Sequence, residues 1–447
     1  MPSCRTLTIS KLGAALALVA SCGDPSPGRG DEGGPGGISL SAGSGAVDTT
    51  AAGDTAPATT PATTEGGDSD GLCGAGGEVD FSYIWIANST EGTVSKIDTV
   101  TGVELARYRT GPDDLTDPSR TSVNLEGDVV VANRHGGLVK IAAIGERCVD
   151  RNADGIIQTS TGPTDVLAWD SDECVLWYQA LPFVSDDDGG NRWGPRPVAW
   201  DAGIPDPDDS CKRSGARVWV GWYEGVDANT ATFRRFDGAT GEQVDEVVVP
   251  NWAQLPLPSV RPYGGATDAQ GNFWVLGKNN QLVRIDGETL EYEQHYAPIW
   301  VDFYGLALDR HGEPWIGGCD GNVYHFDPTT KQFAATDGVQ GCVRGIQIDR
   351  DDRGWVAGND PCRLVEVDTA TGTVVDDNIP LPGCVNPVGI SIDVEGYVWV
   401  VDKDANRAFK VDPDSHAVVA EVGGLVSPYT YSDMTGAGLR LVLTPEG

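Results

Sequence analysis

A sequence unit of about 40 residues recurs along most of the chain, and this repeat constrains the fold more than any other feature. Each unit has a short apolar strand, Asp-x-x-Gly, a second strand often centred on Trp, and a third strand that ends in Asp before a Thr-Gly type of turn. Apolar and polar positions alternate within the strands, and the Gly-containing pairs mark hairpin turns. The clearest copies begin at Pro262, Phe303, Val343 and Pro387. A four-stranded unit at this spacing is typical of a β-propeller blade.

The two ends of the repeat region are complementary. The segment from Ser82 has the second, third and fourth strands of a unit, whereas the segment from Pro428 supplies a first strand with no unit after it. Looser copies begin at Pro118 and Pro195. We expect the two ends to complete one blade, because closing the ring removes exposed sheet edges. The sequence therefore predicts an all-β fold, a seven-bladed β-propeller over residues 81–447, with an open array or another blade count as the alternative.

The repeat also resembles a known group of proteins. The pattern Pro-x-Gly-x-x-x-Asp-x-x-Gly-x-x-Trp, then Ile-Asp-x-x-Thr-Gly, is similar to that of the seven-bladed virginiamycin B lyase (streptogramin lyase) and NHL-like superfamily. In the lyase, this resemblance implies Mg²⁺ with a catalytic histidine and glutamate at the channel mouth, which open a cyclic depsipeptide by elimination. No histidine of this chain occupies the matching position, and only His135 follows a second strand close to a predicted mouth. We therefore assign no catalytic residue, and a divalent-metal-dependent lyase or hydrolase stays as the alternative function.

Arginine and tyrosine dominate the start of the first strands, where side chains should face the central channel. The position between Pro and Gly holds, in chain order, Ser119, Arg196, Tyr263, Tyr304, Arg344, Val388 and Tyr429. Arginine offers a planar fork to carboxylate or phosphate, and tyrosine offers a stacking face with a donor. The predicted ligand-binding residues are Arg120, Arg196, Arg261, Tyr263, Tyr304, Arg344 and Tyr429. The alternative is structural: the arginines would neutralise acidic groups elsewhere around the ring.

The charge balance excludes some partners. The chain has 31 Lys+Arg against 66 Asp+Glu, a formal net charge of −35. Sequence-independent nucleic-acid binding requires clustered Lys and Arg against phosphates, so we expect no nucleic-acid partner. Docking on anionic lipid by charge is disfavoured for the same reason.

The first 80 residues predict export and a tether. Arg5 and Lys11 precede a short apolar run over residues 12–20, which is typical of a signal peptide over residues 1–21. The sequence Val-Ala-Ser-Cys that ends at Cys22 resembles the lipobox of bacterial lipoproteins, and this resemblance implies that Cys22 carries the lipid anchor. Gly23 follows it in place of an aspartate, which favours the outer membrane or cell surface over inner-membrane retention. Residues 22–80 are rich in Gly, Ser, Thr, Pro and Asp, and predict a disordered linker. An ordinary secreted protein is the alternative.

Eight cysteines remain once Cys4 and Cys22 are set aside, and an even number in an exported chain predicts four disulfides. Two of these cysteines follow second strands and two precede the first strands of the next blades. This placement favours bonds between successive blades, although Cys342–Cys362 within one blade competes. The predicted pairs are Cys319–Cys342, Cys362–Cys384, Cys148–Cys174 around an insert, and Cys73–Cys211 by elimination.

The insert at residues 145–175 contains a possible calcium loop. Asp150, Asn152, Asp154 and the carbonyl of Ile156 match ligand positions 1, 3, 5 and 7 of an EF-hand-like loop. Position 12 is threonine, so we expect the remaining ligand to come from Asp165, Asp172 or Glu173. The sequence predicts a structural Ca²⁺ site, and a plain Asx-turn loop is the alternative.

These features predict an exported, lipid-anchored, monomeric propeller. We interpret it as a binding or scaffold module for a protein, a glycan or a small anionic ligand. Mg²⁺ in the channel belongs only to the enzyme alternative.

Overall fold

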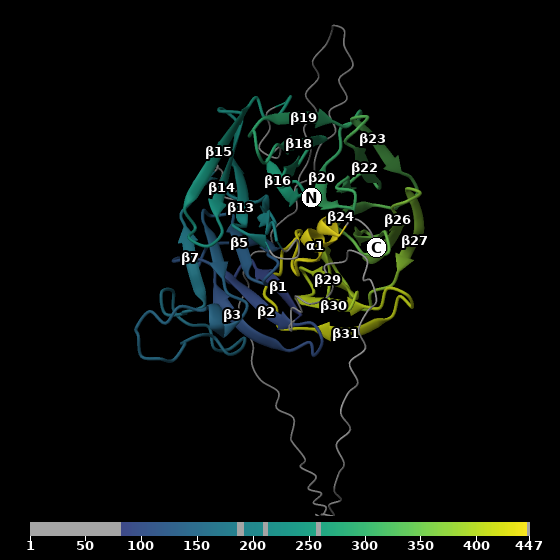
Figure 1. The fold of residues 1–447 in the computed structure, drawn as a ribbon. Coiled ribbons are helices and arrows are strands. Elements are labelled where there is room, and N and C mark those ends of the chain that lie inside the picture. The colour runs from purple at the N-terminus through teal and green to yellow at the C-terminus, as the bar shows by residue number, and fades with distance from the viewer. Residues whose placement is uncertain (1–81, 186–191, 209–212, 256–260, 445–447) are drawn as a thin grey trace, which may run out of the picture. The chain divides into compact units, whose positions relative to one another are not determined.

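The strands of the repeat form seven sheets arranged around a central axis (Figure 1). The computed structural model describes residues 82–185, 192–208, 213–255 and 261–444. We letter the seven sheets as blades A to G in chain order. Blade A contains β1 (Tyr83–Asn88), β2 (Thr93–Asp98) and β3 (Glu104–Arg109), and blade B contains β4 (Pro118–Val123), β5 (Val129–Asn133), β6 (Leu138–Ile141) and β7 (Val175–Gln179).

The other five blades have four strands each. Blade C contains β10 (Val198–Trp200), β13 (Arg217–Tyr223), β14 (Thr230–Asp237) and β15 (Gln243–Pro250). Blade D contains β16 (Pro262–Thr267), β17 (Phe273–Gly277), β18 (Gln281–Ile285) and β19 (Tyr292–Tyr296). Blade E contains β20 (Phe303–Leu308), β21 (Pro314–Gly318), β22 (Val323–Asp327) and β23 (Gln332–Thr336). Blade F contains β24 (Cys342–Ile348), β25 (Arg353–Asn359), β26 (Arg363–Asp368) and β27 (Thr373–Ile379). Blade G contains β28 (Pro387–Ile392), β29 (Val398–Asp402), β30 (Arg407–Val411) and β31 (Val418–Val422).

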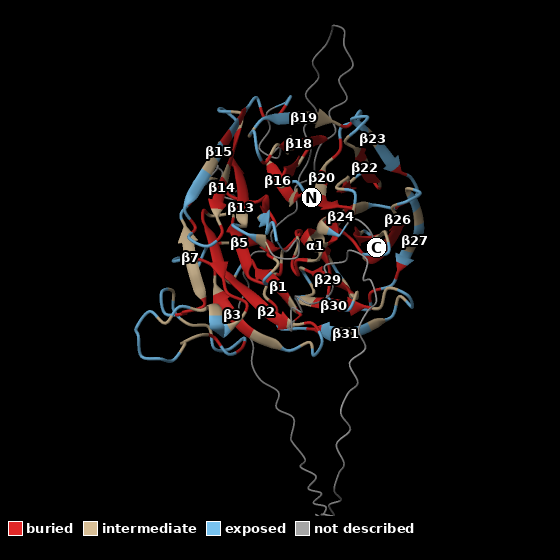
Figure 2. Ribbon diagram, viewed as in Figure 1, coloured by how far each residue is buried: buried red, intermediate tan, exposed pale blue. Residues whose placement is uncertain are grey.

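Shorter elements decorate this ring. The hairpins β8 (Val184–Ser185) with β9 (Arg192–Trp193) and β11 (Ile204–Pro205) with β12 (Arg213–Ser214) flank β10 in the sequence, and the 3₁₀ turn η1 (Gly145–Arg147) opens the insert between β6 and β7. The first strands of successive blades contact one another around the centre. The inner strands are buried, whereas the outermost strands are the most exposed (Figure 2). The predicted seven-bladed propeller is therefore confirmed.

In blades D to G a hydrogen bond joins the repeated Asp and Trp. Trp315 Nε1 donates to Asp309 Oδ2 at 3.1 Å, and the same bond recurs at 2.9 Å between Trp355 and Asp349. The other oxygen of the aspartate accepts backbone N–H groups of the turn, as Asp309 Oδ1 does from residues 311 and 313. The repeated sequence motif thus predicts a turn and a buried tryptophan anchor at once.

In blades D to G the glycine after the channel-facing position reflects close packing of the first strands. A Cβ at Gly305 would lie 2.3 Å from the carbonyl oxygen of Arg344, and one at Gly389 would lie 2.0 Å from that of Thr430. Neighbouring strands therefore approach too closely for a side chain at these positions.

The two ends of the repeat region close the ring, as predicted. Pro428 forms a β-bridge with Asn88, and the Tyr429 N–H donates to the carbonyl of Ala87 at 3.0 Å. The C-terminal segment then leaves the strand path and forms α1 (Ala437–Leu443) near the centre of the ring (Figure 1). The sequence pattern did not indicate this helix.

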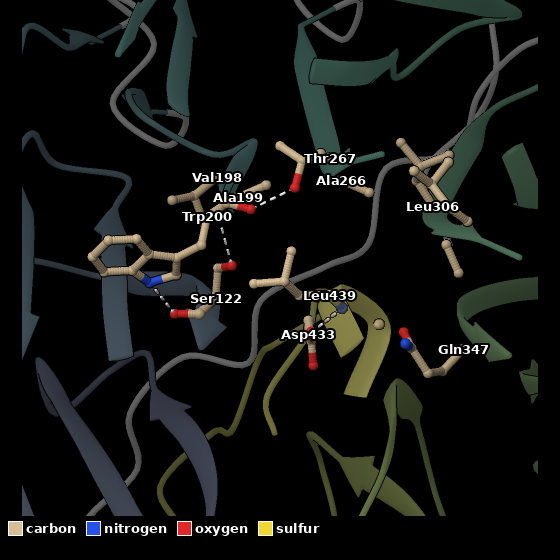
Figure 3. A pocket seen from close by; sticks show the side chains of 14 residues that line it. Ser122, Val198, Ala199, Trp200, Ala266, Thr267, Leu306, Gln347, Asp433 and Leu439 are labelled. Atoms are coloured by element: carbon tan, nitrogen blue, oxygen red, sulfur yellow. Dashed lines mark hydrogen bonds between the residues drawn. The ribbon is translucent and has the colours of Figure 1, made fainter. Parts of the chain in front are cut away.

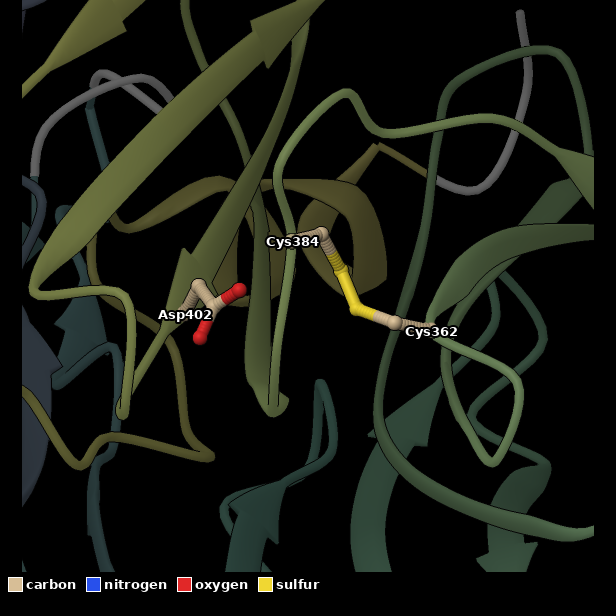
Figure 4. A group of neighbouring side chains, drawn as sticks. All are labelled: Cys362, Cys384 and Asp402. Atoms are coloured by element: carbon tan, nitrogen blue, oxygen red, sulfur yellow. A yellow bond between two sulfur atoms is a disulfide. The ribbon is translucent and has the colours of Figure 1, made fainter.

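Three disulfides join the pairs that the spacing favoured: Cys148–Cys174, Cys319–Cys342 and Cys362–Cys384. The last two connect blade E to blade F and blade F to blade G, and Figure 4 shows one of them beside Asp402. Disulfides persist in oxidising compartments, which indicates an extracellular or periplasmic protein. No helix in the described part of the chain is long and apolar enough to span a membrane. The signal peptide, Cys22, the linker and the Cys73–Cys211 pair lie outside the described residues.

Candidate functional site

Cationic and aromatic side chains gather at one end of the channel, where the first strands begin. We call this group the channel mouth. Its arginines and lysine lie within about 6 Å of the tyrosine rings, in cation–π contact. The channel mouth comprises Arg120, Arg134, Arg196, Arg261, Lys278, Arg344, Tyr263, Tyr304, Tyr429 and Tyr431.

Arg120 crosses the channel from blade B. Its guanidinium carbon lies 4.5 Å from the ring centres of both Tyr263 and Tyr431, and its Nε donates to the Tyr263 carbonyl at 3.2 Å. A register shift between Pro118 and Arg120 puts Arg120 opposite Ala132, at the place where blade D has Gly264. Blade B thus has a long cationic side chain at the position where blades D to G have glycine.

Several guanidinium N–H groups of the mouth have no partner. Nη2 of Arg120, Nε and Nη1 of Arg196, and Nε of Arg344 are buried without a hydrogen bond among the described residues. None of these three arginines forms an ion pair with a carboxylate in the described part of the chain; Arg344 reaches only the amide oxygen of Asn386 and the hydroxyl of Tyr431. The structure therefore does not support the alternative in which they neutralise acidic groups around the ring.

Burial and mutual repulsion make charge costly for Arg196. Burial is the largest effect, and the neighbouring charges of Arg261 and Arg134 add to it, so that the pKa of Arg196 falls to about 9. An arginine in water keeps its proton well above this value. Arg134 pairs with Asp117, whereas Arg120, Arg196 and Arg344 have no carboxylate partner among the described residues.

Tyr263 is the phenol of the channel mouth whose pKa is lowered. Burial opposes its ionisation, but the charges of Arg196 and Arg120 outweigh burial and lower its pKa. Its hydroxyl lies 2.6 Å from the hydroxyl of Tyr429. Burial raises the pKa of Tyr304 and of Tyr431 instead, and the neighbouring phenols add to this rise. The arginines therefore favour a phenolate at Tyr263, the ring that lies among them.

The structure brings all seven predicted channel residues together at the mouth. The sequence analysis missed Arg134, Lys278 and Tyr431. Arg134 and Lys278 follow second strands, the position that drew attention to His135, and Tyr431 lies two residues after Tyr429. The positions of these three residues in the repeat could therefore have indicated them.

Exposed apolar side chains surround the channel mouth. They lie on the loops that lead into the first strands, and so on the same face of the ring as the mouth. Their residues are 43–64% exposed, in contrast to the buried blades: Leu115, Phe183, Ile299, Trp300 and Val385.

The opposite end of the channel is closed. Leu439 of α1 and Asp433 lie against the ends of the first strands around a cavity of about 30 Å³ (Figure 3). Both carboxylate oxygens of Asp433 accept backbone N–H groups, including that of Leu439 at 3.2 Å, which fixes the start of the helix.

The mouth does not suit the Mg²⁺ that the superfamily resemblance implies. Mg²⁺ takes oxygen ligands, with carboxylates foremost. The described mouth offers guanidinium, ammonium and phenol groups, which repel or poorly bind a hard dication. Groups of His, Cys, Asp and Glu that could hold a metal occur elsewhere in the described chain: Asp309 with Glu313 and His325, and Asp402 with Cys362 and Cys384, whose sulfurs form a disulfide (Figure 4).

The predicted calcium loop is folded around its own backbone. Asp150 Oδ2 accepts the N–H of Gly155 at 2.9 Å, and Asp154 Oδ1 accepts that of Ile156 at 2.8 Å. Glu173 binds the N–H groups of Arg151 and Gln158. The side chains of Asn152, Asp165 and Asp172 likewise accept backbone N–H groups of the insert. Calcium binding stays a prediction.

Comparison with known proteins finds similarity only at the level of solved structures, because no protein-family model and no curated protein matches the chain. A streptogramin B lyase structure is 14% identical, with 72% of this chain and 88% of that chain covered and a TM-score of 0.48. Virginiamycin B lyase from Staphylococcus aureus is 16% identical over 72% and 93%, with a TM-score of 0.46. Apo AztD from Citrobacter koseri is 16% identical over 79% and 97%, with a TM-score of 0.44. These similarities transfer no residue roles to this chain.

Proposed function

We propose that the protein is a binding module whose channel mouth takes the anionic group of a ligand. The observation that carries this proposal is the set of buried guanidinium N–H groups without partners on Arg120, Arg196 and Arg344. A buried donor left unpaired costs about 1–3 kcal/mol, and a charged one costs more. A carboxylate or phosphate offers paired oxygens that match the guanidinium fork and would satisfy these donors.

The surroundings of the mouth support a ligand with an apolar part. Exposed side chains such as Trp300 and Val385 lie on the same face, within an otherwise acidic protein. A chain end with a free carboxylate and apolar side chains combines both features. The metal-dependent lyase alternative has less support, because the carboxylate beside the mouth, Asp117, already pairs with Arg134 and lies 3.5 Å from His135.

The lowered pKa of Tyr263 provides a test. The pKa of this phenol is lowered to about 6, so it is ionised near pH 7.5, whereas an unfolded tyrosine ionises only around pH 10. We expect a tyrosinate absorption band near pH 7.5 that Tyr263→Phe removes. An anion bound at the arginines compensates their charge and raises the pKa of Tyr263. A short apolar peptide with a free C-terminal carboxylate should therefore weaken the band in an ultraviolet titration, whereas the same peptide with an amidated end should not.

The lowered pKa of Tyr263 also makes the free energy of unfolding depend on pH. Above about pH 6 the folded protein has lost a proton that the unfolded chain retains, so the free energy of unfolding rises with pH from there towards neutrality. Tyr296→Phe is the matched control, because burial raises the pKa of Tyr296 and this phenol stays protonated at neutral pH. The proposal fails if neither the free peptide nor inorganic phosphate changes the tyrosinate band. If phosphate changes the band and the peptide does not, the result supports an anion site and rejects a peptide C-terminus as its ligand.

We further propose that Cys22 carries a lipid anchor at the outer membrane or cell surface and that the loop of Asp150, Asn152 and Asp154 binds Ca²⁺. The motifs in the sequence support both. The melting temperature should fall on addition of a chelator selective for Ca²⁺, and the double variant Asp150→Ala, Asp154→Ala should not respond to it. An equal melting temperature with and without Ca²⁺ would reject the calcium site.

A further inference from the structure

A second polar site lies far out on the ring, in a groove of about 580 Å³ lined by residues of blades E and F. Asp309, Glu313 and His325 each direct a ligand atom to one point there, and these atoms lie within 4.8 Å of one another. His325 Nε2 and Glu313 Oε2 are 2.6 Å apart, and the imidazole stacks on Trp315 with ring centres 4.6 Å apart. His311 and Asp352 line the same groove.

Four other blades place a permanent cation at this point, and blade D places an amide there. In blade G, Lys410 Nζ lies 3.0 Å from Asp393, the aspartate that corresponds to Asp309. The corresponding contacts join Arg353 to Asp349 at 2.8 Å in blade F and Arg217 to Asp201 at 3.1 Å in blade C. In blade B, Lys140 lies 3.3 Å from Asp128, and in blade D the amide of Asn272 donates to Asp268 at 2.9 Å.

Blade E departs from this pattern in two ways. Glu313 adds a second carboxylate beside Asp309, and His325 occupies the third-strand position opposite the tryptophan, where blade G has Lys410 opposite Trp399. Neither Asp309 nor Glu313 has a lysine or arginine partner among the described residues. Two carboxylates and an imidazole thus meet where the repeat otherwise supplies positive charge.

The hydrogen bonds around Asp309 orient it as a metal ligand. A carboxylate has about four lone-pair positions. Two backbone N–H groups bind Oδ1 of Asp309, and the Trp315 indole binds Oδ2, which leaves one position on Oδ2. Donors of this kind fix the orientation of ligands in metal sites.

We propose that Asp309, Glu313 and His325 bind a divalent transition-metal ion of the zinc class. The mixture of one imidazole with two carboxylates suits Zn²⁺, Co²⁺ or Mn²⁺ better than Ca²⁺ or Mg²⁺, which take oxygen ligands only. On binding, the proton shared between His325 Nε2 and Glu313 leaves to solvent, and the metal ion takes its place. The ion supplies the positive charge that lysine and arginine supply in the other blades.

Isothermal titration of the purified protein with ZnCl₂, and the visible absorption of added Co²⁺, test this site. We expect one equivalent of Zn²⁺ to bind and to raise the melting temperature. The variant His325→Lys copies the arrangement of blade G, so it should fold and melt like the metal-free wild type. Its affinity for Zn²⁺ should fall on the order of 100-fold or more, and Glu313→Gln should also weaken binding.

His416→Gln is the matched control. His416 contacts Glu366 at 3.0 Å and Asp376 at 3.5 Å, but through different ring nitrogens, so its loss should leave Zn²⁺ binding unchanged. The proposal is overturned if the wild type shows no saturable Zn²⁺ binding, or if His325→Lys binds Zn²⁺ as tightly as the wild type does. Loss of binding in His416→Gln with retention in His325→Lys would also overturn it.

Discussion

Deletion of residues 425–447 should prevent cooperative folding of the propeller. This segment closes the ring through the bridge between Pro428 and Asn88, and it buries Leu425, Tyr431 and Met434 almost completely. Burying one such side chain contributes about 1.5–3 kcal/mol, so three contribute about 5–9 kcal/mol. A typical domain is stable by only about 5–15 kcal/mol. Circular dichroism during heating should therefore show no sharp transition for the truncated protein.

Addition of the missing segment as a separate peptide gives a direct control. If ring closure is the cause, the peptide should restore the transition by pairing with the free edge of β1. The exposed outer strand provides a second control, since Val419→Ser should change the melting temperature little. A truncated protein that melts like the full chain would show that the ring does not depend on this closure.

Substitution of Arg196 by methionine should stabilise the protein and abolish anion binding. The residue is 4% exposed, and its Nε and Nη1 have no partner among the described residues. Below about pH 6, where Tyr263 is neutral, the charge of Arg196 is buried without compensation, so an apolar side chain of similar length should raise the free energy of unfolding there by about 1–3 kcal/mol. Because Arg196 is the strongest of the charges that lower the pKa of Tyr263, this pKa should rise and the tyrosinate band should weaken near pH 7.5.

Arg234→Met is the matched variant for this experiment. Arg234 lies on β14 and pairs with Glu246 at 2.7 Å in a partly exposed position, where an ion pair contributes about 0–1 kcal/mol. We expect a small loss of stability and unchanged anion binding. Urea unfolding and the peptide titration measure both properties. If Arg196→Met lowered the free energy of unfolding by more than about 1 kcal/mol, the arginine would have a structural role instead.

The fold could be predicted because its signals are local. The aspartate, the turn and the tryptophan of a blade lie within seven successive residues, as in Asp349 to Trp355, and their hydrogen bonds form within that span. The helix Ala437–Leu443 could not be predicted in the same way. Its short apolar run resembles a strand, and its buried cap, Asp433, becomes evident only when the end of the channel surrounds it.

The two sites differ in how far the sequence indicated them. The mouth follows from one repeated position, so Arg196, Tyr263 and Arg344 could be identified before the structure. Arg120 occupies the position where blades D to G have glycine, and its contacts with the rings of Tyr263 and Tyr431 become evident only in the structure. Glu313 directly precedes β21 and His325 lies on β22, and they meet only through the pairing of these two strands, so no short motif marks them.

The closure of the channel by α1 also bears on how the proposed ligand would enter and leave the mouth. Leu439 of α1 and Asp433 occupy the far end, so the ligand of the proposed function would enter and leave on the face that carries the mouth. Two ligands that both reach the arginines would therefore compete. The ring would not be a passage between its two faces.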